Sequence, residues 1–358
     1  MTAALTSDAA AGGAGPTSRV AVIGPHILDV LGRPVEAIPP GQGSVRLTEI
    51  RATAAGTAAG TGVDLAKLGA RVSSFGAVGT DLLAEVLLAA LASYGIDTRG
   101  LVRKSSAQTS ATILPIRPNG ERPALHVPGA TRLLELSDLD HAELAGGFDA
   151  VLLGGPDALA GLSRDDLGAV VAAAREGGAL VAVDVLHAGS ERDFDRIGAV
   201  LAGADWFWPN SDQLLALTGR TDLEHAVGDV LALGTRGVAV TLGADGCVVT
   251  GPDGLTHVPA IAVDVVDTTG CGDAFNAGML TALLMGCDPA DSAWLGVACG
   301  SLVATGLGSD AGLTDLDQVL DFLRAASPEV SSRISARRAP SSTASISPAA
   351  ISTGERVP

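Results

Sequence analysis

The pattern of apolar and polar positions predicts a protein in which buried strands alternate with amphipathic helices. Continuous apolar runs of strand length occur at "RVAVIG" (19–24), "FDAVLLGG" (148–155) and "ALVAVDV" (179–185). Helical periods that end at a glycine follow in "DLLAEVLLAALASYG" (81–95) and "SRDDLGAVVAAAREGG" (163–178). Short connections between such elements favour a mostly parallel sheet with helices on both faces, so the expected fold class is α/β and Rossmann-like.

Two segments depart from this alternation. "SVRLTEI" (44–50) and "SATILPIRPNGERPALHV" (110–127) are short, strand-like and polar at alternate positions, and the second contains the hairpin turn signal Asn119-Gly120. A small hairpin cannot bury a core by itself. We therefore expect a small β-lid inserted into the α/β body, with pieces near 30–55 and 105–130.

Both ends of the chain have low-complexity sequence. Residues 1–18 are predicted to be a flexible leader; they lack a basic segment followed by an apolar one, so no signal peptide is expected. The run rich in Ser, Pro and Ala that starts at Ser327 has no apolar period. It is predicted to be a disordered tail over 327–358, which leaves one folded domain over 19–326.

Composition and charge exclude several classes of function. The formal net charge is −17, and an acidic chain lacks the basic surface that a nucleic-acid partner requires. The mean hydropathy is +0.37, but no run of about 18 apolar residues occurs without Gly or a charge, so no membrane span is expected. The four cysteines form no C-x-x-C pair, which favours reduced thiols and a cytoplasmic location.

The segment "DTTGCGDAFNAG" (267–278) carries the clearest chemistry. Gly270 and Gly272 allow successive backbone N–H groups to face one point at a helix start, an arrangement that binds anions. Asp273, in the first helical turn, could take a proton from a hydroxyl while these N–H groups stabilise a transferring phosphoryl group. The alternative interpretation is that Asp273 only favours the helix start and the glycines only form a turn.

This segment resembles the C-terminal signature of the ribokinase-like (pfkB) carbohydrate kinases, D-T-x-G-A-G-D, with Cys271 in place of the usual alanine. The resemblance extends over about 19–310. The other similar segments are "VAVIGPHILDV" (20–30), "AGTAAGTGVDLAKLGARVSSFGAVGTD" (55–81), "WFWPNSDQLLALTG" (206–219), "VAVTLGADG" (238–246) and "GSLVATGLGSDAGL" (300–313). The resemblance implies a ribokinase-like fold.

The resemblance also implies roles for individual residues. Asp273 would be the general base, and Gly270, Cys271 and Gly272 would form the anion hole. The residues implied to bind the substrate are Asp29, on the turn after the first strand, Gly56 and Gly60. The residues implied at the nucleotide are Asn210, Thr241, Gly243 and Gly246. Mg²⁺ would lie near Asn210 and, through water, Gln213, and a monovalent cation such as K⁺ near Asp267 and Thr269.

Several positions depart from the family pattern, mostly in the half that faces the sugar. Ala55-Gly56 replaces the usual Gly-Gly, Gly60 stands where an Asn commonly touches the sugar, and the G-D-D turn reads Gly79-Thr80-Asp81. Gln213 replaces the Glu of N-x-x-E. Phosphoryl transfer is therefore better supported than any particular acceptor.

The function that the resemblance implies is ATP-dependent phosphorylation of a hydroxyl group of a sugar or sugar-like alcohol. A nucleoside kinase and a catalytically retired sugar sensor are the alternatives. Aromatic residues are only 3% of the chain, which favours a sugar over a base that needs flat surfaces. An exposed β-lid is consistent with a homodimer formed through it.

Overall fold

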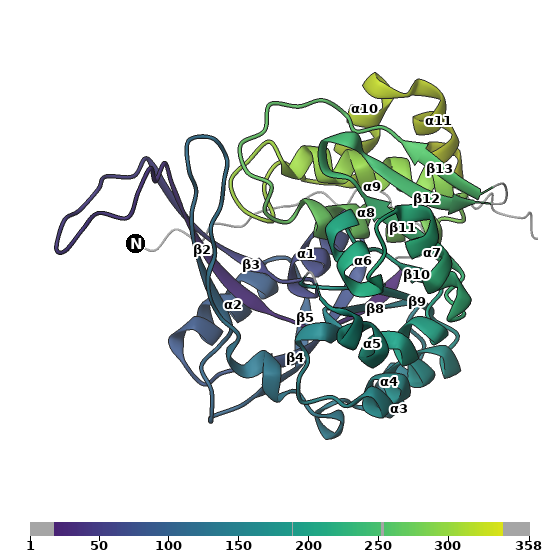
Figure 1. Ribbon diagram of the computed structural model, residues 1–358, viewed down its shortest axis with the longest axis horizontal. Helices are drawn as coiled ribbons and strands as arrows, with labels where there is room; N and C mark the ends of the chain where they lie inside the picture. Colours follow the sequence, from purple (N-terminus) through teal and green to yellow (C-terminus); the bar gives the residue numbers. More distant parts are fainter. Residues whose placement is uncertain (1–17, 188, 252–253, 339–358) are drawn as a thin grey trace, which may run out of the picture.

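The computed structural model describes residues 18–187, 189–251 and 254–338 and is built around a nine-stranded sheet (Figure 1). The strand order is β13-β12-β11-β10-β9-β8-β1-β4-β5. All strand pairs from β5 to β11 are parallel, and β12 and β13 continue the sheet as an antiparallel hairpin. The strands are β1 (Arg19–Ile23), β4 (Arg71–Val78), β5 (Asp97–Arg103), β8 (Ala150–Gly154), β9 (Leu180–Asp184), β10 (Trp206–Phe207), β11 (Gly237–Thr241), β12 (Cys247–Gly251) and β13 (Gly254–Val258). The predicted α/β class is confirmed.

Helices cover both faces of this sheet because successive residues of each buried strand point to opposite sides. Val20 and Val22 of β1 belong to one core, and Ala21 and Ile23 belong to the other. The first core lies under α1 (Ala59–Lys67), α2 (Leu82–Ser93), α8 (Cys271–Leu284), α9 (Pro289–Val303), α10 (Leu316–Ala326) and α11 (Pro328–Arg337). The second lies under α3 (His141–Leu144), α4 (Arg164–Glu176), α5 (Glu191–Gly203), α6 (Ser211–Thr218) and α7 (Leu223–Ala232).

Helix ends follow the signals in the sequence. The Asp81 carboxylate accepts from the N–H of Ala84 at 3.0 Å and caps α2. Ser163 and Asp166 form a reciprocal capping box at the start of α4. Gly95 follows α2 with a φ of +73°, a conformation that favours glycine. No helix in the described part of the chain is long and apolar enough to cross a membrane.

The lid is a separate four-stranded sheet of order β3-β2-β6-β7, which projects at the left of Figure 1. Its strands are β2 (Ile27–Arg33), β3 (Glu49–Ala55), β6 (Ala111–Pro115) and β7 (Leu125–Val127). The register places Thr53, Asp29, Thr112 and His126 opposite one another, one from each strand. This polar row lies on one face of the lid, since the adjacent row on the other face is apolar: Ala52, Val30, Ile113 and Leu125.

Two details of the lid differ from the sequence prediction. Residues 44–48 are not a strand; β3 begins at Glu49 and continues through the small residues that precede Gly56. Asp29, expected on a turn after the first strand, lies inside β2, because the chain enters the lid directly after Gly24.

The prediction of a disordered tail from residue 327 is wrong for its first part. Helix α11 (Pro328–Arg337) packs through Val330 and Ile334, which are 5% and 0% exposed. Arg333 also forms a two-bonded ion pair with Asp291 of α9, at 2.8 and 2.5 Å. The remainder of the predicted tail, 339–358, and residues 1–17 of the predicted leader lie outside the described residues.

Candidate active site

The site forms where the order of the sheet reverses. From β1 the chain proceeds to β4 and β5 on one side, then returns to β8 and continues to β11 on the other. The carboxyl ends of β1 and β8 therefore flank a topological switch point, the position at which open α/β sheets bind ligands. The lid sheet, α8 and the loops that follow β1, β8 and β9 surround this point (Figure 1).

The start of α8 forms the predicted anion-binding turn. Gly270, immediately before the helix, has φ +81° and ψ 0°. A side chain there would fall 2.5 Å from the Cα of Ser309, so both conformation and space require glycine. Within the described residues, the N–H groups of Gly272 and Asp273 donate to no protein acceptor. A left-handed residue before a helix with free N–H groups is a nest suited to phosphate.

Asp273 lies partly buried between this turn and α1. A Cβ on Gly60 would fall 2.4 Å from its Oδ2, and the Thr61 hydroxyl donates to its Oδ1 at 3.5 Å. Loss of hydration, followed by the charge of Asp29, raises the pKa of Asp273 to about 7. A carboxyl group with this pKa can exchange a proton near neutral pH.

Asp29 shares this environment with Asp273. It lies in β2, is 6% exposed, and belongs to the polar row of the lid. Burial raises the pKa of Asp29 to about 6, against the opposing effect of a hydrogen bond from Thr112. Gly56 supports this arrangement, because a Cβ there would fall 2.8 Å from the Pro25 carbonyl oxygen before β2.

Asp267 connects the anion-binding turn to a second loop. Its Oδ1 accepts from the N–H and the hydroxyl of Thr269, at 3.0 and 2.8 Å, and its Oδ2 accepts from the N–H of Gly308 at 2.9 Å. The adjacent Ser309 hydroxyl donates to the Ala54 carbonyl oxygen of β3 at 3.0 Å. The buried carboxylate of Asp267 thus fixes the turn relative to the lid.

A cavity of about 450 Å³ lies beside the anion-binding turn. Its wall contains three residues implied at the nucleotide, Thr241, Gly243 and Gly246, together with Cys271 and Gly272 of the turn. The rest of its wall is mostly apolar and comes from 260–265, α8 and α9. A largely apolar cavity that ends at a phosphate-binding turn is suited to a nucleotide. Burial raises the pKa of the Cys271 thiol to about 12, so this cysteine contributes backbone and packing.

Asn210 and Gln213 form the N-terminal capping box of α6. The Asn210 Oδ1 accepts from the Gln213 N–H, and the Gln213 Oε1 accepts from the Asn210 N–H, both at 2.8 Å. Gln213 also donates from Nε2 to the Val185 carbonyl oxygen at 2.9 Å. Asn210 lies beside Thr241, next to the cavity. Asn210 therefore caps α6. Its role at the phosphates stays a prediction, as does contact of Gln213 with a metal-bound water.

Two site residues were not found from the sequence. Arg122, in the lid hairpin, donates from Nε to the Thr268 hydroxyl at 3.1 Å, and its charge lowers the pKa of both Asp29 and Asp273. Asp184, at the end of β9, is buried and accepts from Asn276 of α8 at 2.7 Å. The position of Asp184 at the carboxyl end of a buried strand was a usable signal; Arg122 offered none, because only the folded lid hairpin brings it to the turn.

Comparisons with known proteins are decisive for the family. The sequence profile of the pfkB family carbohydrate kinases matches residues 17–316. The chain belongs to this family. It is 30% identical over 290 residues to an ATP-dependent ribose-1-phosphate kinase of Halopiger xanaduensis, covering 81% of this chain and 93% of that protein. It is also 30% identical over 281 residues to an aminoimidazole riboside kinase of Salmonella typhimurium, covering 75% and 87%.

Another pfkB relative and two solved structures are also similar to this chain. A 1-phosphofructokinase of Haloferax volcanii is 31% identical over 277 residues, covering 74% of this chain and 84% of that protein. A putative ribokinase from Agrobacterium tumefaciens superposes with a TM-score of 0.75 at 25% identity, covering 86% of this chain and 98% of the other. A putative ribokinase II from E. coli, solved with ATP and Mg²⁺, superposes with a TM-score of 0.73 at 20% identity, covering 86% of this chain and 99% of the other. This similarity shows the shared fold. The chain is thus a sugar or nucleoside kinase, a phosphotransferase that acts on an alcohol group.

Proposed function

We propose that this kinase transfers the γ-phosphoryl group of ATP to a hydroxyl group of a sugar or sugar-like alcohol, with Asp273 as the general base. The observation that carries the proposal is the position of Asp273. It lies at the N-terminus of α8 beside free backbone N–H groups, on the boundary between the nucleotide cavity and the carboxyl group of Asp29.

The chemistry follows from these positions. The Asp29 carboxylate accepts a hydrogen bond from an acceptor hydroxyl and orients it, and the Asp273 carboxylate removes the proton from the hydroxyl that reacts. That oxygen forms a bond to the γ-phosphorus while the bond between this phosphorus and the bridging β-γ oxygen breaks, which leaves ADP. The N–H groups of the turn at Gly270, Cys271 and Gly272 stabilise the charge on the transferring group.

The residues present fit Mg²⁺ that enters with the nucleotide. Among the described residues no three His, Cys, Asp or Glu side chains gather into a metal site. Mg²⁺ commonly keeps several waters and is held by substrate phosphates and one or two protein groups. Bound in this way, it supplies charge neutralisation at the phosphates. Asn210, beside Thr241, is the proposed protein group nearest to it.

A monovalent cation such as K⁺ remains a proposal for the loop around Asp267 and Thr269. Both carboxylate oxygens of Asp267 accept hydrogen bonds within the protein. A carboxylate has about four lone-pair positions, so oxygen capacity for a cation remains.

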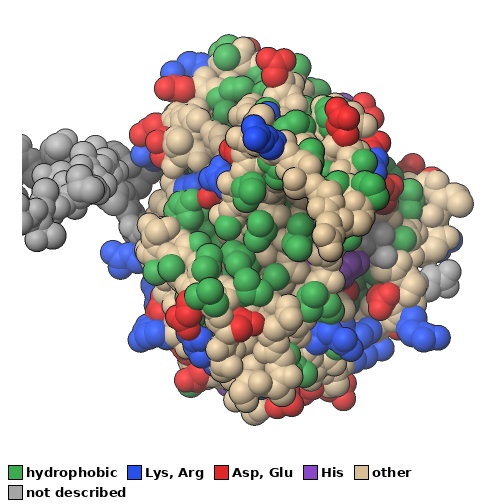
Figure 2. Space-filling model, turned by 90° about the vertical axis from the view of Figure 1, so that its left-hand side faces the viewer, with side chains coloured by type: hydrophobic (Ala, Val, Ile, Leu, Met, Phe, Trp, Pro, Cys, Tyr) green, Lys and Arg blue, Asp and Glu red, His purple; other side chains and the backbone are tan. Residues whose placement is uncertain are grey.

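The lid supports the proposal of a homodimer. The outer face of the lid exposes Ile113, Leu125 and Val127, which are 58%, 57% and 44% accessible. Figure 2, viewed from the lid side, shows hydrophobic side chains gathered on that face. Exposed apolar patches of this kind often mark interfaces, so we expect a second copy to cover it; its test is the mass of the protein in solution.

The acceptor class is tested by ADP release from Mg²⁺-ATP across pentoses, hexoses, keto-acids and nucleosides. We expect a sugar to give the highest kcat/KM. A nucleoside as the best acceptor would favour the alternative kinase. Binding of sugars, seen as thermal stabilisation, with no ADP release from any compound would favour the retired sensor and would contradict the proposal.

A further inference from the structure

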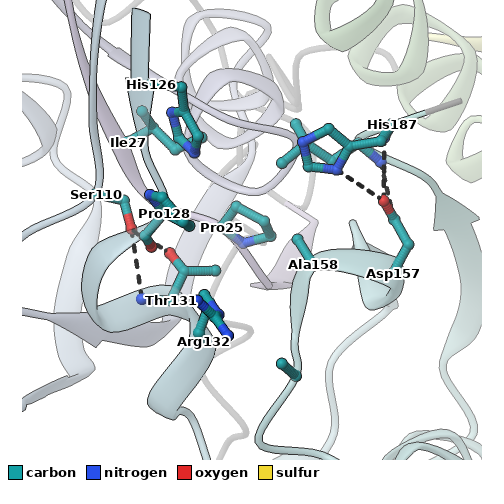
Figure 3. Close-up of a pocket in the computed structure, with 12 residues that line it drawn as sticks. Pro25, Ile27, Ser110, His126, Pro128, Thr131, Arg132, Asp157, Ala158 and His187 are labelled. Carbon is teal, nitrogen blue, oxygen red and sulfur yellow. Dashed lines mark hydrogen bonds and ion pairs between the residues drawn. The ribbon is translucent and has the colours of Figure 1, made fainter. Parts of the chain in front are cut away.

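A second cavity, of about 260 Å³, opens beside the proposed acceptor position and is separate from the nucleotide cavity (Figure 3). Its floor is formed by loops at the carboxyl ends of β1, β8 and β9, through Pro25, Asp157 and His187. Its roof comes from the lid, through Ile27 of β2 and His126 of β7. The cavity therefore lies at the same switch point as the proposed active site.

The polar row of the lid joins this cavity to Asp29. Thr112 lies between them: it is opposite Asp29 in the register and lowers the pKa of that carboxyl group, and its hydroxyl is 3.1 Å from the Nδ1 of His126. Ile27, in the cavity wall, precedes Asp29 by two residues in β2, and alternate strand residues share a face. A molecule whose hydroxyl group is held by Asp29 can thus extend into the cavity.

Half of the residues that line this cavity are apolar, and most of its polar side chains are hydrogen-bond donors or can carry a positive charge. Burial, followed by the charge of His187, lowers the pKa of His126, so this histidine contributes mainly as a neutral hydrogen-bonding group. His126 and His187 lie on opposite sides of it in Figure 3, and Arg132 lies at its lower edge. In the described part of the chain, the Arg132 guanidinium makes no hydrogen bond or ion pair with the protein. The hydroxyl groups of Ser110 and Thr131, 2.7 Å apart, complete this wall.

Among the described residues that line the cavity, one is a carboxylate, and it is already engaged. Asp157 has a side chain that is 5% exposed, and it accepts from the N–H groups of Leu186 and His187 at 2.9 and 3.0 Å. It is also 3.2 Å from the Nδ1 of His187, which leaves the other ring nitrogen of that histidine turned toward the cavity (Figure 3). This contact with Asp157 raises the pKa of His187 and favours its charged form.

We propose that this cavity binds a second, anionic group of the acceptor, a phosphate or carboxylate, through Arg132, His126 and His187. The acceptor is then a sugar phosphate or sugar acid rather than a neutral sugar. This inference rests on the proposed function, because it assigns the far end of the same substrate. In a chain of net charge −17, such a substrate needs a local cationic site, and this cavity supplies one.

The test is ADP release by the full chain with Mg²⁺-ATP and matched acceptors. The pairs are ribose with its 1- and 5-phosphates, fructose with its 1- and 6-phosphates, and a sugar alcohol with the corresponding sugar acid. We expect at least one charged member to exceed its neutral partner by roughly tenfold or more in kcat/KM, as charge-assisted hydrogen bonds would give. The charged acceptor with the highest kcat/KM shows whether the cavity binds a phosphate or a carboxylate group.

Variants of Arg132 test whether the preference for charged acceptors arises from this cavity. Arg132→Gln should lower kcat/KM for the charged acceptor by roughly tenfold, mainly through KM, and change the value for its neutral partner by less than about twofold. Arg132→Lys should retain much of the preference. The matched control is Arg324→Gln, which removes an equal charge from exposed α10, where Arg324 pairs only with Asp321 among the described residues, and should leave both values unchanged.

The possible outcomes distinguish failure of the proposed kinase activity from failure of the anionic subsite. If no acceptor of either kind yields ADP, the proposed function itself fails. If neutral sugars are phosphorylated as well as or better than their charged partners, the kinase proposal survives and the anionic subsite is wrong. An equal loss on charged and neutral acceptors in Arg132→Gln would also overturn it, because a merely structural role would not discriminate between them.

Discussion

At the scale of single residues, the protein places two carboxyl groups with raised pKa values beside each other. The pKa is about 6 for Asp29 and about 7 for Asp273. Both shifts come first from burial, and the charge of Asp29 raises the pKa of Asp273 further. A base must be ionised to accept a proton, so the environment that raises the pKa also sets the pH at which transfer begins.

This predicts the pH dependence of the reaction. The value of kcat/KM should rise with pH, reach half of its maximum near pH 7 and level off about one pH unit higher, because the ionised fraction of Asp273 in the free enzyme increases through its pKa. Asp29→Asn removes the neighbouring charge, so the pKa of Asp273 falls and the acidic limb should move to lower pH even if the rate is reduced. A profile that is flat between pH 5.5 and 8.5 in wild type would contradict the assignment.

The contacts of Gln213 change the effect that is expected from a carboxylate at this position. A carboxylate at this position would be expected to strengthen Mg²⁺ binding, but the Gln213 Nε2 donates to the Val185 carbonyl oxygen in a buried setting. Gln213→Glu would set an oxygen against that carbonyl. We expect a loss of about 1–3 kcal/mol of unfolding free energy and an unchanged Mg²⁺ requirement.

The measurements for Gln213→Glu are chemical denaturation and a Mg²⁺ titration at fixed ATP. Asp212→Asn, at the exposed neighbouring position, is the control and should leave stability nearly unchanged. A several-fold drop in the Mg²⁺ concentration for half-maximal rate would instead place residue 213 at the metal.

The sequence predicts the turn at the start of α8 more readily than the contacts that surround it. The glycines and Asp273 lie in one contiguous segment, so local chain geometry was enough to place the turn and the acid together. Asp184 and Arg122 come from distant segments, and their proximity to Asp273 depends on sheet order and on the fold of the lid hairpin. The position of Asp184 at a strand end was readable from the sequence, but its contacts were not, and Arg122 shows no local signal.

At the scale of elements, α11 shows what a composition argument misses. Its segment is rich in serine and has only two long apolar residues, Val330 and Ile334, spaced i and i+4. That spacing forms a single contact stripe on one helix face. Packing against α10 and α9 then stabilises a helix that composition alone assigned to a disordered tail.

Ile334→Ala therefore should destabilise the protein. Ile334 is fully buried, and removal of a buried Ile side chain costs about 2–5 kcal/mol. We expect the melting temperature to fall by several degrees, measured by calorimetry, with Ser332→Ala on the exposed face of α11 as the control. An unchanged melting temperature would mean that α11 does not dock on the body.

The lid hairpin is the second element with a testable role. Arg122 reaches from the hairpin to Thr268, beside the anion-binding turn, and favours the ionised form of Asp273. Arg122→Gln should lower kcat/KM by roughly tenfold, as loss of a charge-assisted contact, and move the acidic limb to higher pH. Arg117→Gln, in the same hairpin but paired with Glu121, is the matched control; equal effects from both would indicate a general effect on the lid.

At the scale of the whole molecule, the α/β body could be predicted and the arrangement of the lid only in part. Buried strands such as β1 and β8 are continuous apolar runs whose period and length are readable. The lid strands are short, and their positions are set by pairing between distant segments, such as Asp29 with Thr112. The polar row that leads from the second cavity to Asp29 exists only in that register.

The account as a whole depends on Asp273 as the base, and Asp273→Asn tests it most directly. The substitution preserves size and hydrogen-bonding reach but removes the proton acceptor. With ATP binding confirmed by titration and the best acceptor at saturation, we expect kcat to fall by roughly 10²–10⁴, while affinity for ATP changes little. A variant that retains near wild-type kcat on that acceptor would contradict the account.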